Sequence, residues 1–232
     1  IMARRFTLEG AKVEAVVEIM PFISGLMRNV VQCLEDFNIP LLLEHTVTFI
    51  HGKDRVEGVT VAKLDHNGVP MSGTERMIEC DTLILSVGLI PENELSTEAN
   101  IALDPATGGP IVNEYMETSI AGVFACGNVV HVHDLVDHVT IAGEIAGESA
   151  AKYAMGKLPL LRRKIFLKAG ENVRYIVPQL ISGERPVSLF IRVKRPMRNV
   201  KLKIGEALTL PRPIVRAGEI EVAQLAPTHL KA

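Results

Sequence analysis

A short apolar run that ends in Gly-Asn places the strongest constraint on the fold of this chain. Residues 123–126 (Val-Phe-Ala-Cys) lie between turn residues, which predicts a short buried strand. Gly127 and Asn128 end the run, and a helical pattern resumes after Asp134. Gly lets the backbone approach a ligand closely, and the next side chain can hydrogen-bond a sugar-like hydroxyl. The pattern suits a ligand at the carboxyl edge of a sheet, although a strand–turn–helix unit without a ligand has the same pattern.

The first residues have the pattern of the second half of a βαβ unit. Residues 1–9 are expected to end a helix that stops at Gly10, and residues 12–19 are expected to form an apolar strand. No two glycines are spaced Gly-x-Gly, so the sequence contains no dinucleotide fingerprint. We therefore expect a C-terminal fragment of a longer protein, whose first strand and Gly-rich turn precede residue 1. A protein that never had this turn is the alternative.

The remaining segments alternate between helical and β periodicity. Apolar residues fall at helical spacing over residues 24–37, and residues 140–155 are expected to form a helix with Thr140 as its N-cap. The β-rich segments between these helices are residues 41–50, 56–64, 74–80 and 82–87. After residue 158 the β-like segments are short and separated by Gly and Pro turns; they are residues 173–177, 187–193, 199–204 and 219–225.

Two stretches resemble motifs of the FAD- and NAD-linked pyridine nucleotide–disulfide oxidoreductase family, in its thioredoxin-reductase-like branch. Residues 118–128 are similar to the second flavin-contacting motif, in which a short strand leads to Ala-x-Gly-Asp and the Asp holds the ribityl chain of FAD. Residues 81–93 are similar to the motif in which a strand ends in Gly and Pro as the chain crosses from the NAD domain to the FAD domain. Asn128 stands where the family has Asp, and an amide can still donate and accept a hydrogen bond.

The resemblance covers roughly residues 1–158 and implies an α/β chain. The implied fold is the two-dinucleotide-binding-domain flavoprotein fold, N-terminally truncated, with a small antiparallel β C-terminal module. Its expected parts are a partial NAD-binding domain, the C-terminal part of an FAD-binding domain and the β-rich module, at residues 1–90, 91–158 and 159–232. By the same resemblance, residues 41–80 form an antiparallel meander and residues 82–87 a buried parallel strand. The β-rich module is similar to the tail of accessory flavoproteins of glycerol-3-phosphate- or opine-type dehydrogenases.

The resemblance also implies residues that bind FAD and NAD. Glu18 ends a strand where an acidic residue hydrogen-bonds the adenosine ribose, and its carboxylate would repel a 2′-phosphate, which favours NAD over NADP. A solvent-exposed Glu at a strand end is the alternative. The amino end of the helix after Asn128 is expected to point backbone N–H groups at the flavin. The expected cofactor-binding residues are Glu18, Gly88, Pro91, Gly127, Asn128, Thr140, Ile141 and Ala142.

Residues 129–138 contain three histidines and two aspartates. Their mixture of alternating and helical spacing gives no single coordinating face, so no metal site is expected. In the family this segment runs beside the isoalloxazine ring, which makes His131, His133 and Asp137 candidates for substrate binding or proton transfer. A polar loop is the alternative, and none of the three residues is preferred.

Composition excludes several classes of protein. The net charge of −2 gives no electrostatic reason to expect nucleic acid or an anionic membrane as a partner. No apolar run approaches the roughly 18 residues of a membrane span. The cysteines, Cys33, Cys80 and Cys126, form neither a Cys-x-x-Cys pair nor a metal-ligand spacing, and their sparse, odd number favours a reducing, cytoplasmic location.

The sequence thus predicts an FAD-dependent oxidoreductase that passes hydride between NAD(H) and the flavin, then electrons to a non-disulfide acceptor or partner subunit. An electron-relay or structural subunit of a multi-subunit dehydrogenase is the alternative, and an interaction module without cofactors is a third class. The expected partner is a dehydrogenase subunit, or a second copy bound through the C-terminal module. We expect the fragment alone to hold FAD poorly and to be inactive.

Overall fold

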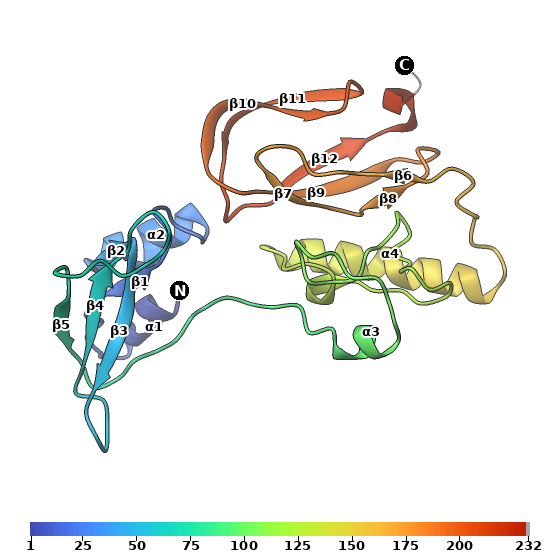
Figure 1. Ribbon diagram of the computed structural model, residues 1–232. Helices are drawn as coiled ribbons and strands as arrows, with labels where there is room; N and C mark the ends of the chain where they lie inside the picture. The colour runs from blue at the N-terminus through green and yellow to red at the C-terminus, as the bar shows by residue number, and fades with distance from the viewer. Residues whose placement is uncertain (231–232) are drawn as a thin grey trace. The chain divides into compact units, whose positions relative to one another are not determined.

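The computed structural model describes residues 1–230, and the chain divides into two compact units (Figure 1). The first unit is Ile1–Val87, and the second begins at Gly88. Residues on both sides of the expected boundary at 158/159 therefore belong to one compact unit. None of the helices among residues 1–230 combines the length and the apolar character that crossing a membrane requires.

The first unit combines a short parallel strand pair with an antiparallel meander. Strand β1 pairs in parallel with β2, with Val16 opposite Leu41 and Glu18 opposite Leu43. The second sheet has the order β3-β4-β5, and both of its pairings are antiparallel. The elements are α1 (Met2–Leu8), β1 (Val16–Glu18), α2 (Met27–Cys33), the 3-10 helix η1 (Glu35–Phe37), β2 (Leu41–Leu43), β3 (His45–His51), β4 (Gly58–Lys63) and β5 (Arg76–Glu79).

Local chemistry explains how these elements end. Helix α1 is followed by Gly10 at φ +92, as expected for a Gly that ends a helix. Helix α2 buries Val30 and Cys33, so Cys33 is a core residue. Asn38 adopts a left-handed conformation after η1, which Asn tolerates better than most residues, and this turns the chain into β2.

The expected buried strand at residues 82–87 is wrong. This segment is extended but pairs with no other strand within the described residues. Its side chains are exposed: Leu85 by 74% and Val87 by 93%. A strand needs a hydrogen-bonded neighbour, and β1 and β2, which would be its parallel neighbours, pair only with each other.

The second unit places one long helix beside a β-rich module. Its main sheet is antiparallel with the order β12-β9-β7, while β10 pairs with β11 and β6 with β8. The elements are α3 (Glu94–Glu98), the 3-10 helix η2 (Gly127–Val129), α4 (Val136–Ala154), β6 (Ile165–Phe166), β7 (Val173–Val177), β8 (Leu180–Ile181), β9 (Val187–Val193), β10 (Met197–Ile204), β11 (Leu208–Val215), β12 (Glu221–Leu225) and the 3-10 helix η3 (Pro227–Leu230).

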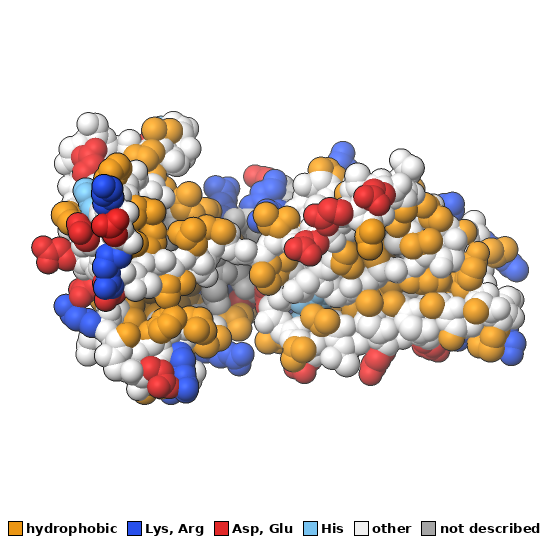
Figure 2. Space-filling model, turned by 90° about the horizontal axis from the view of Figure 1, so that it is seen from below, with side chains coloured by type: hydrophobic (Ala, Val, Ile, Leu, Met, Phe, Trp, Pro, Cys, Tyr) orange, Lys and Arg blue, Asp and Glu red, His pale blue; other side chains and the backbone are white. Residues whose placement is uncertain are grey.

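Two apolar clusters form the core of this unit. One joins α4, through Ala142 and Ala146, to Tyr175 and Phe190 of the main sheet. The other lies within the β-rich module around Leu189 of β9. The first cluster contains residues from both sides of position 158, so α4 and the β-rich module stabilise each other. Apolar side chains in α4 and just after it are also exposed, among them Val136, Ile141 and Met155. Figure 2 shows hydrophobic side chains spread over the face of the molecule that it draws.

Candidate functional site

The Gly127–Asn128 turn lies where the expected strand at residues 123–126 would end. Those residues form no regular strand: Phe124 makes one isolated bridge with Glu117, and Val123 is 38% exposed. The expectation of a buried strand is therefore wrong, because a single bridge is the only strand pairing the described residues offer here. Gly127 is buried and has a φ of +71, which side-chain-bearing residues rarely adopt.

Asn128 presents a free donor at this turn. Its side chain is exposed, and its Oδ1 accepts a hydrogen bond from the backbone N–H of His133 at 3.1 Å. Its Nδ2 donates to no group among residues 1–230, so both amide hydrogens remain for a ligand. Asp would accept the same bond from His133, which explains how Asn can keep this loop in place.

Two residues that sequence reasoning missed hold the Gly127–Asn128 turn in place. Asn93 is buried, and its Nδ2 donates at 2.9 Å both to the carbonyl of Gly108 and to that of Val129. A Cβ on Gly109 would lie 2.0 Å from the carbonyl oxygen of Val130, so only Gly allows this close approach. Asn93 precedes a helix and Gly109 lies in a dense turn, but neither local pattern indicates the contacts that these residues make.

Helix α4 begins earlier than the sequence suggested. Its first residue is Val136, after Leu135 in an extended conformation, so the expected N-cap at Thr140 is wrong. The hydroxyl of Thr140 donates to the carbonyl of Val136 at 3.2 Å, as in a helix interior. The N–H groups of Thr140, Ile141 and Ala142 therefore lie beyond the first turn. The free N–H groups and positive end of the helix dipole belong instead to the turn that starts at Val136.

The histidines form a packed cluster around Phe190. The ring centroids of His131 and His133 are 4.0 Å apart, and that of His138 is 5.3 Å from that of Phe190. His131 is 1% exposed, and its Nδ1 has no hydrogen-bond partner within the described part of the chain. Burial, with nearby His133, Arg192 and His138, lowers the pKa of His131 to about 3, and burial also lowers the pKa of His133.

The three residues predicted as candidates for proton transfer thus do not lie in one group. His131 and His133 lie together but stay neutral near pH 7, and their rings pack as aromatic groups. Asp137 is exposed in the first turn of α4, outside this cluster. No group of three or more potential ligands among residues 1–230 is arranged to hold a metal ion.

An arginine of the β-rich module holds the loop that contains these histidines. Arg192, on β9, donates to the carboxylate of Asp134 at 2.7 Å and to the carbonyl of Val132 at 3.1 Å. It also donates to the hydroxyl of Tyr175 and to the carbonyl of Ala217, each at 3.1 Å. We call these contacts the Arg192 clasp. Sequence reasoning missed it because Arg192 and Asp134 lie 58 positions apart.

The candidate for NAD lies at the end of β1, and the candidates Gly88 and Pro91, expected at the crossing to the FAD domain, follow the exposed segment 82–87. Glu18 ends β1, and its two carboxylate oxygens accept from the N–H of Met20 at 3.0 Å and the hydroxyl of Ser24 at 2.7 Å. Each oxygen keeps a lone pair for a ribose hydroxyl. Gly88 is exposed with a φ of +98, and open space surrounds its Cβ position, so backbone conformation alone explains this Gly. Pro91 is half-buried just before α3.

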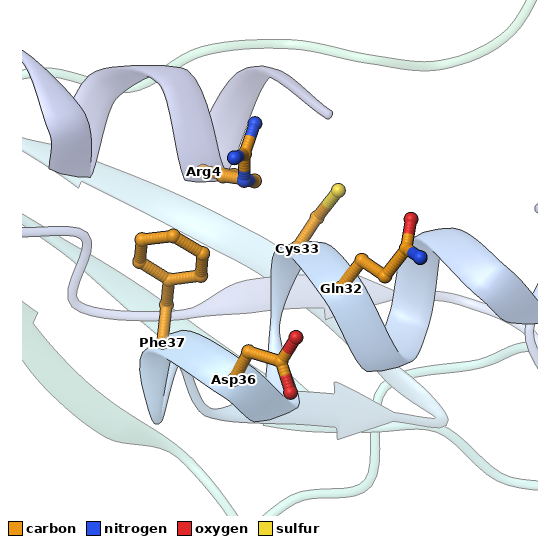
Figure 3. Close-up of a pocket in the computed structure, with 5 residues that line it drawn as sticks. All are labelled: Arg4, Gln32, Cys33, Asp36 and Phe37. Carbon is orange, nitrogen blue, oxygen red and sulfur yellow. The ribbon is translucent and has the colours of Figure 1, made fainter.

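The residues present fit parts of both cofactors. The unused amide donor of Asn128 matches the hydroxyls of a ribityl chain, and the φ of +71 at Gly127 disfavours a residue with a side chain. The anchored carboxylate of Glu18 matches the diol of an adenosine ribose. A separate pocket between α1, α2 and η1 contains none of these residues; it is lined by Arg4, Gln32, Cys33, Asp36 and Phe37 (Figure 3).

Comparisons with known proteins place the chain in a family. Residues 2–151 match the family model described as pyridine nucleotide-disulphide oxidoreductase. The chain is similar to mercuric reductase of Staphylococcus aureus, with 28% identity over 136 residues, covering 56% of this chain and 24% of that protein. It is also similar to nitric oxide reductase FlRd-NAD(+) reductase of Shigella flexneri, with 28% identity over 163 residues, covering 66% of this chain and 40% of that protein.

Among solved structures, the thioredoxin reductase of T. acidophilum has 26% identity and a TM-score of 0.49, covering 61% of this chain and 44% of that chain. The chain therefore spans less than half the length of these relatives. The family match includes both quoted motifs, so it confirms the resemblance and the two-dinucleotide-binding-domain flavoprotein fold that it implied. The chain belongs to the pyridine nucleotide-disulphide oxidoreductase family.

Proposed function

We propose that the protein passes hydride between NAD(H) and FAD and then delivers electrons to an acceptor other than a disulfide. Members of the family use FAD and NAD(P)H, which supports both cofactors. The observation that carries the proposal is the free amide donor of Asn128 on a turn fixed by Asn93 and Gly109. The wide separation of Cys33, Cys80 and Cys126 in the sequence supports a non-disulfide acceptor.

Each residue has a binding or orienting role in this proposal. When bound, FAD supplies the ring that accepts hydride from the nicotinamide. Asn128 donates to a ribityl hydroxyl, and the first turn of α4, from Val136, offers N–H groups and the positive end of its dipole to negative charge on the flavin. Glu18 accepts from the ribose hydroxyls of NAD. The buried His131 and the half-buried His133 are uncharged near pH 7 and support the loop as packed aromatic rings.

The acceptor in this proposal is a partner protein. The Shigella flexneri relative is named nitric oxide reductase FlRd-NAD(+) reductase, a name that pairs NAD(+) with a separate component, FlRd. An acceptor of this kind would also explain why the chain carries a β-rich module beyond residues 2–151 of the family match. Turnover that appears only with a partner subunit would instead favour the electron-relay alternative.

Replacing Glu18 with Gln tests the nicotinamide side. In the protein as it occurs in its cell, with ferricyanide as electron acceptor, we expect Glu18→Gln to raise KM for NADH roughly tenfold and to leave kcat nearly unchanged. The loss of one charged hydrogen bond costs about 1.5 kcal/mol, which corresponds to that factor. The preference for NADH over NADPH should fall, because the carboxylate that repels a 2′-phosphate is removed.

The control for this test is Glu14→Gln. Glu14 precedes the same strand and pairs with exposed Lys12. Its replacement should therefore leave the KM for NADH and the KM for NADPH unchanged. An unchanged KM for NADH in Glu18→Gln would contradict the assigned role of Glu18. Failure of NADH to support any ferricyanide reduction would contradict the proposed function itself.

A further inference from the structure

The charges of this chain are segregated along its sequence. Residues 159–232 contain 15 Lys and Arg but only 5 Asp and Glu, a net charge of +10. Residues 1–158 contain 10 Lys and Arg and 22 Asp and Glu, a net charge of −12. The overall charge of −2 therefore conceals a strongly basic β-rich module.

Several unpaired basic residues of this module lie along one strand and the turn before it. Five of them lie on β10 and the turn before it, all exposed and none in an ion pair within the described residues; they are Lys194, Arg195, Arg198, Lys201 and Lys203. Nearby acids are already used, because Glu221 pairs with Arg212 at 2.6 Å and Glu219 with Arg216 at 3.0 Å. From residue 194 to residue 215 the only acidic residue is Glu206.

The hairpin of β10 and β11 directs Lys201 and Lys203 outward. Leu202, Ile204 and Leu210 pack against the apolar cluster of the main sheet. Side chains alternate between the two faces of a strand, so Lys201 and Lys203 lie on the opposite, exposed face. Their cross-strand partners are Pro211 and Thr209, which carry no charge. The outer face of the hairpin is therefore rigidly supported and basic; we call it the basic hairpin face.

Protection of a strand edge does not account for charges of one sign. Charged side chains of either sign discourage edge-to-edge pairing of strands. Prolines also lack a backbone donor, and β11 already contains Pro211 and Pro213. A surface that carries only positive charge instead favours negatively charged partners and accelerates their association with the protein.

The composition of the face favours a protein as its partner. Neither β10 nor β11 contains an aromatic residue on which nucleic-acid bases could stack. Within residues 159–230 no α-helix is available to enter a DNA groove or to lie on a membrane. We propose that the basic hairpin face docks an acidic protein, and, resting on the function proposed above, that this protein is the electron acceptor.

Charge reversal on the face tests this proposal. The probe is a plant-type ferredoxin, an acidic electron carrier, and its binding to the full chain is measured by surface plasmon resonance at several salt concentrations. We expect Lys201→Glu/Lys203→Glu to weaken binding roughly tenfold at low salt, with the difference shrinking as salt rises. Lys164→Glu/Lys168→Glu makes the same change of charge at exposed residues elsewhere in the module and should weaken binding by less than about twofold.

Three outcomes would overturn the proposal. The first is an equal loss of ferredoxin affinity in both double variants, and the second is no binding of the ferredoxin to the unmodified chain. The third is tighter binding to duplex DNA or to phosphatidylserine vesicles than to the ferredoxin, if that binding also depends on Lys201 and Lys203. Ferricyanide is small and does not need the basic hairpin face, so ferricyanide reduction by NADH should be the same in all variants. Absence of that activity in the unmodified protein would count against the proposed function and leave the docking result to stand by itself.

Discussion

Replacing Arg192 with Met is expected to lower the free energy of unfolding of the second unit by about 3–5 kcal/mol. The Arg192 clasp joins β9 to the loop before α4, and the side chains of Arg192 and Asp134 are only 11% and 13% exposed. Without the guanidinium, the carboxylate of Asp134 stays largely buried with the N–H of Ile220 as its remaining partner. Urea unfolding followed by far-UV circular dichroism measures the loss.

Arg174→Met is the control for the Arg192 prediction. Arg174 lies on the adjacent strand β7 but is exposed and makes no ion pair within the described residues, so its replacement should change the unfolding free energy by less than about 0.5 kcal/mol. In a double-mutant cycle, Asp134→Asn and Arg192→Met should be strongly non-additive, because each removes the same contact. Additive effects, or equal losses in the two Arg variants, would show that the clasp does not hold this loop.

Acidification is expected to destabilise the second unit through His131. The pKa of His131 is about 3 in the folded chain, mainly because of burial, against 6.5 for an ordinary histidine. Between these values the unfolded chain binds a proton that the folded chain excludes, so stability is complete above pH 6.5 and is lost as pH falls. The loss is about 1.4 kcal/mol per pH unit, or about 3 kcal/mol between pH 6.5 and about pH 4. His133, whose pKa is also lowered by burial, acts in the same direction.

His131→Phe should remove most of this dependence on pH. Phe keeps an aromatic ring beside Tyr175 and Phe190 but cannot be protonated. The measurement is the urea midpoint as a function of pH for the unmodified chain, for His131→Phe and for His66→Phe, whose histidine is exposed in a turn of the first unit. If the urea midpoint falls with pH as steeply in His131→Phe as in the unmodified chain, then a group other than His131 causes the loss of stability.

The best-predicted elements are those whose own sequence pattern determines them. Strands β7 and β9 have the expected bounds, because their apolar residues are flanked by Gly and Pro turns and become buried on one sheet. Strand β11 was missed because Pro211 and Pro213 argue against a strand, yet a two-stranded ribbon tolerates Pro at positions that need no donor. The family motifs were recognisable since they depend on local runs around Gly88 and Gly127.

The failures share one physical cause, which is dependence on a distant partner. Residues 82–87 and 123–126 have strand-like composition, but a strand also needs a neighbouring backbone, which local composition does not supply. The start of α4 is the exception, because its cause is local: the helix begins at Val136, directly after the extended Leu135, and has no side-chain cap. The links made by Asn93 and by Arg192 span 36 and 58 positions, beyond the reach of any local pattern.

The affinity for FAD of Asn128 variants tests the central claim most directly. In the protein as it occurs in its cell, we expect Asn128→Ala to raise the Kd for FAD by about fivefold to tenfold, the cost of roughly 1 kcal/mol for a lost hydrogen bond. Asn128→Asp should bind FAD within about twofold of the unmodified protein, because Asp can accept both the ribityl hydroxyl and the N–H of His133. An Asn128→Ala variant that binds FAD as tightly as the unmodified protein would contradict the assignment of this turn to the flavin.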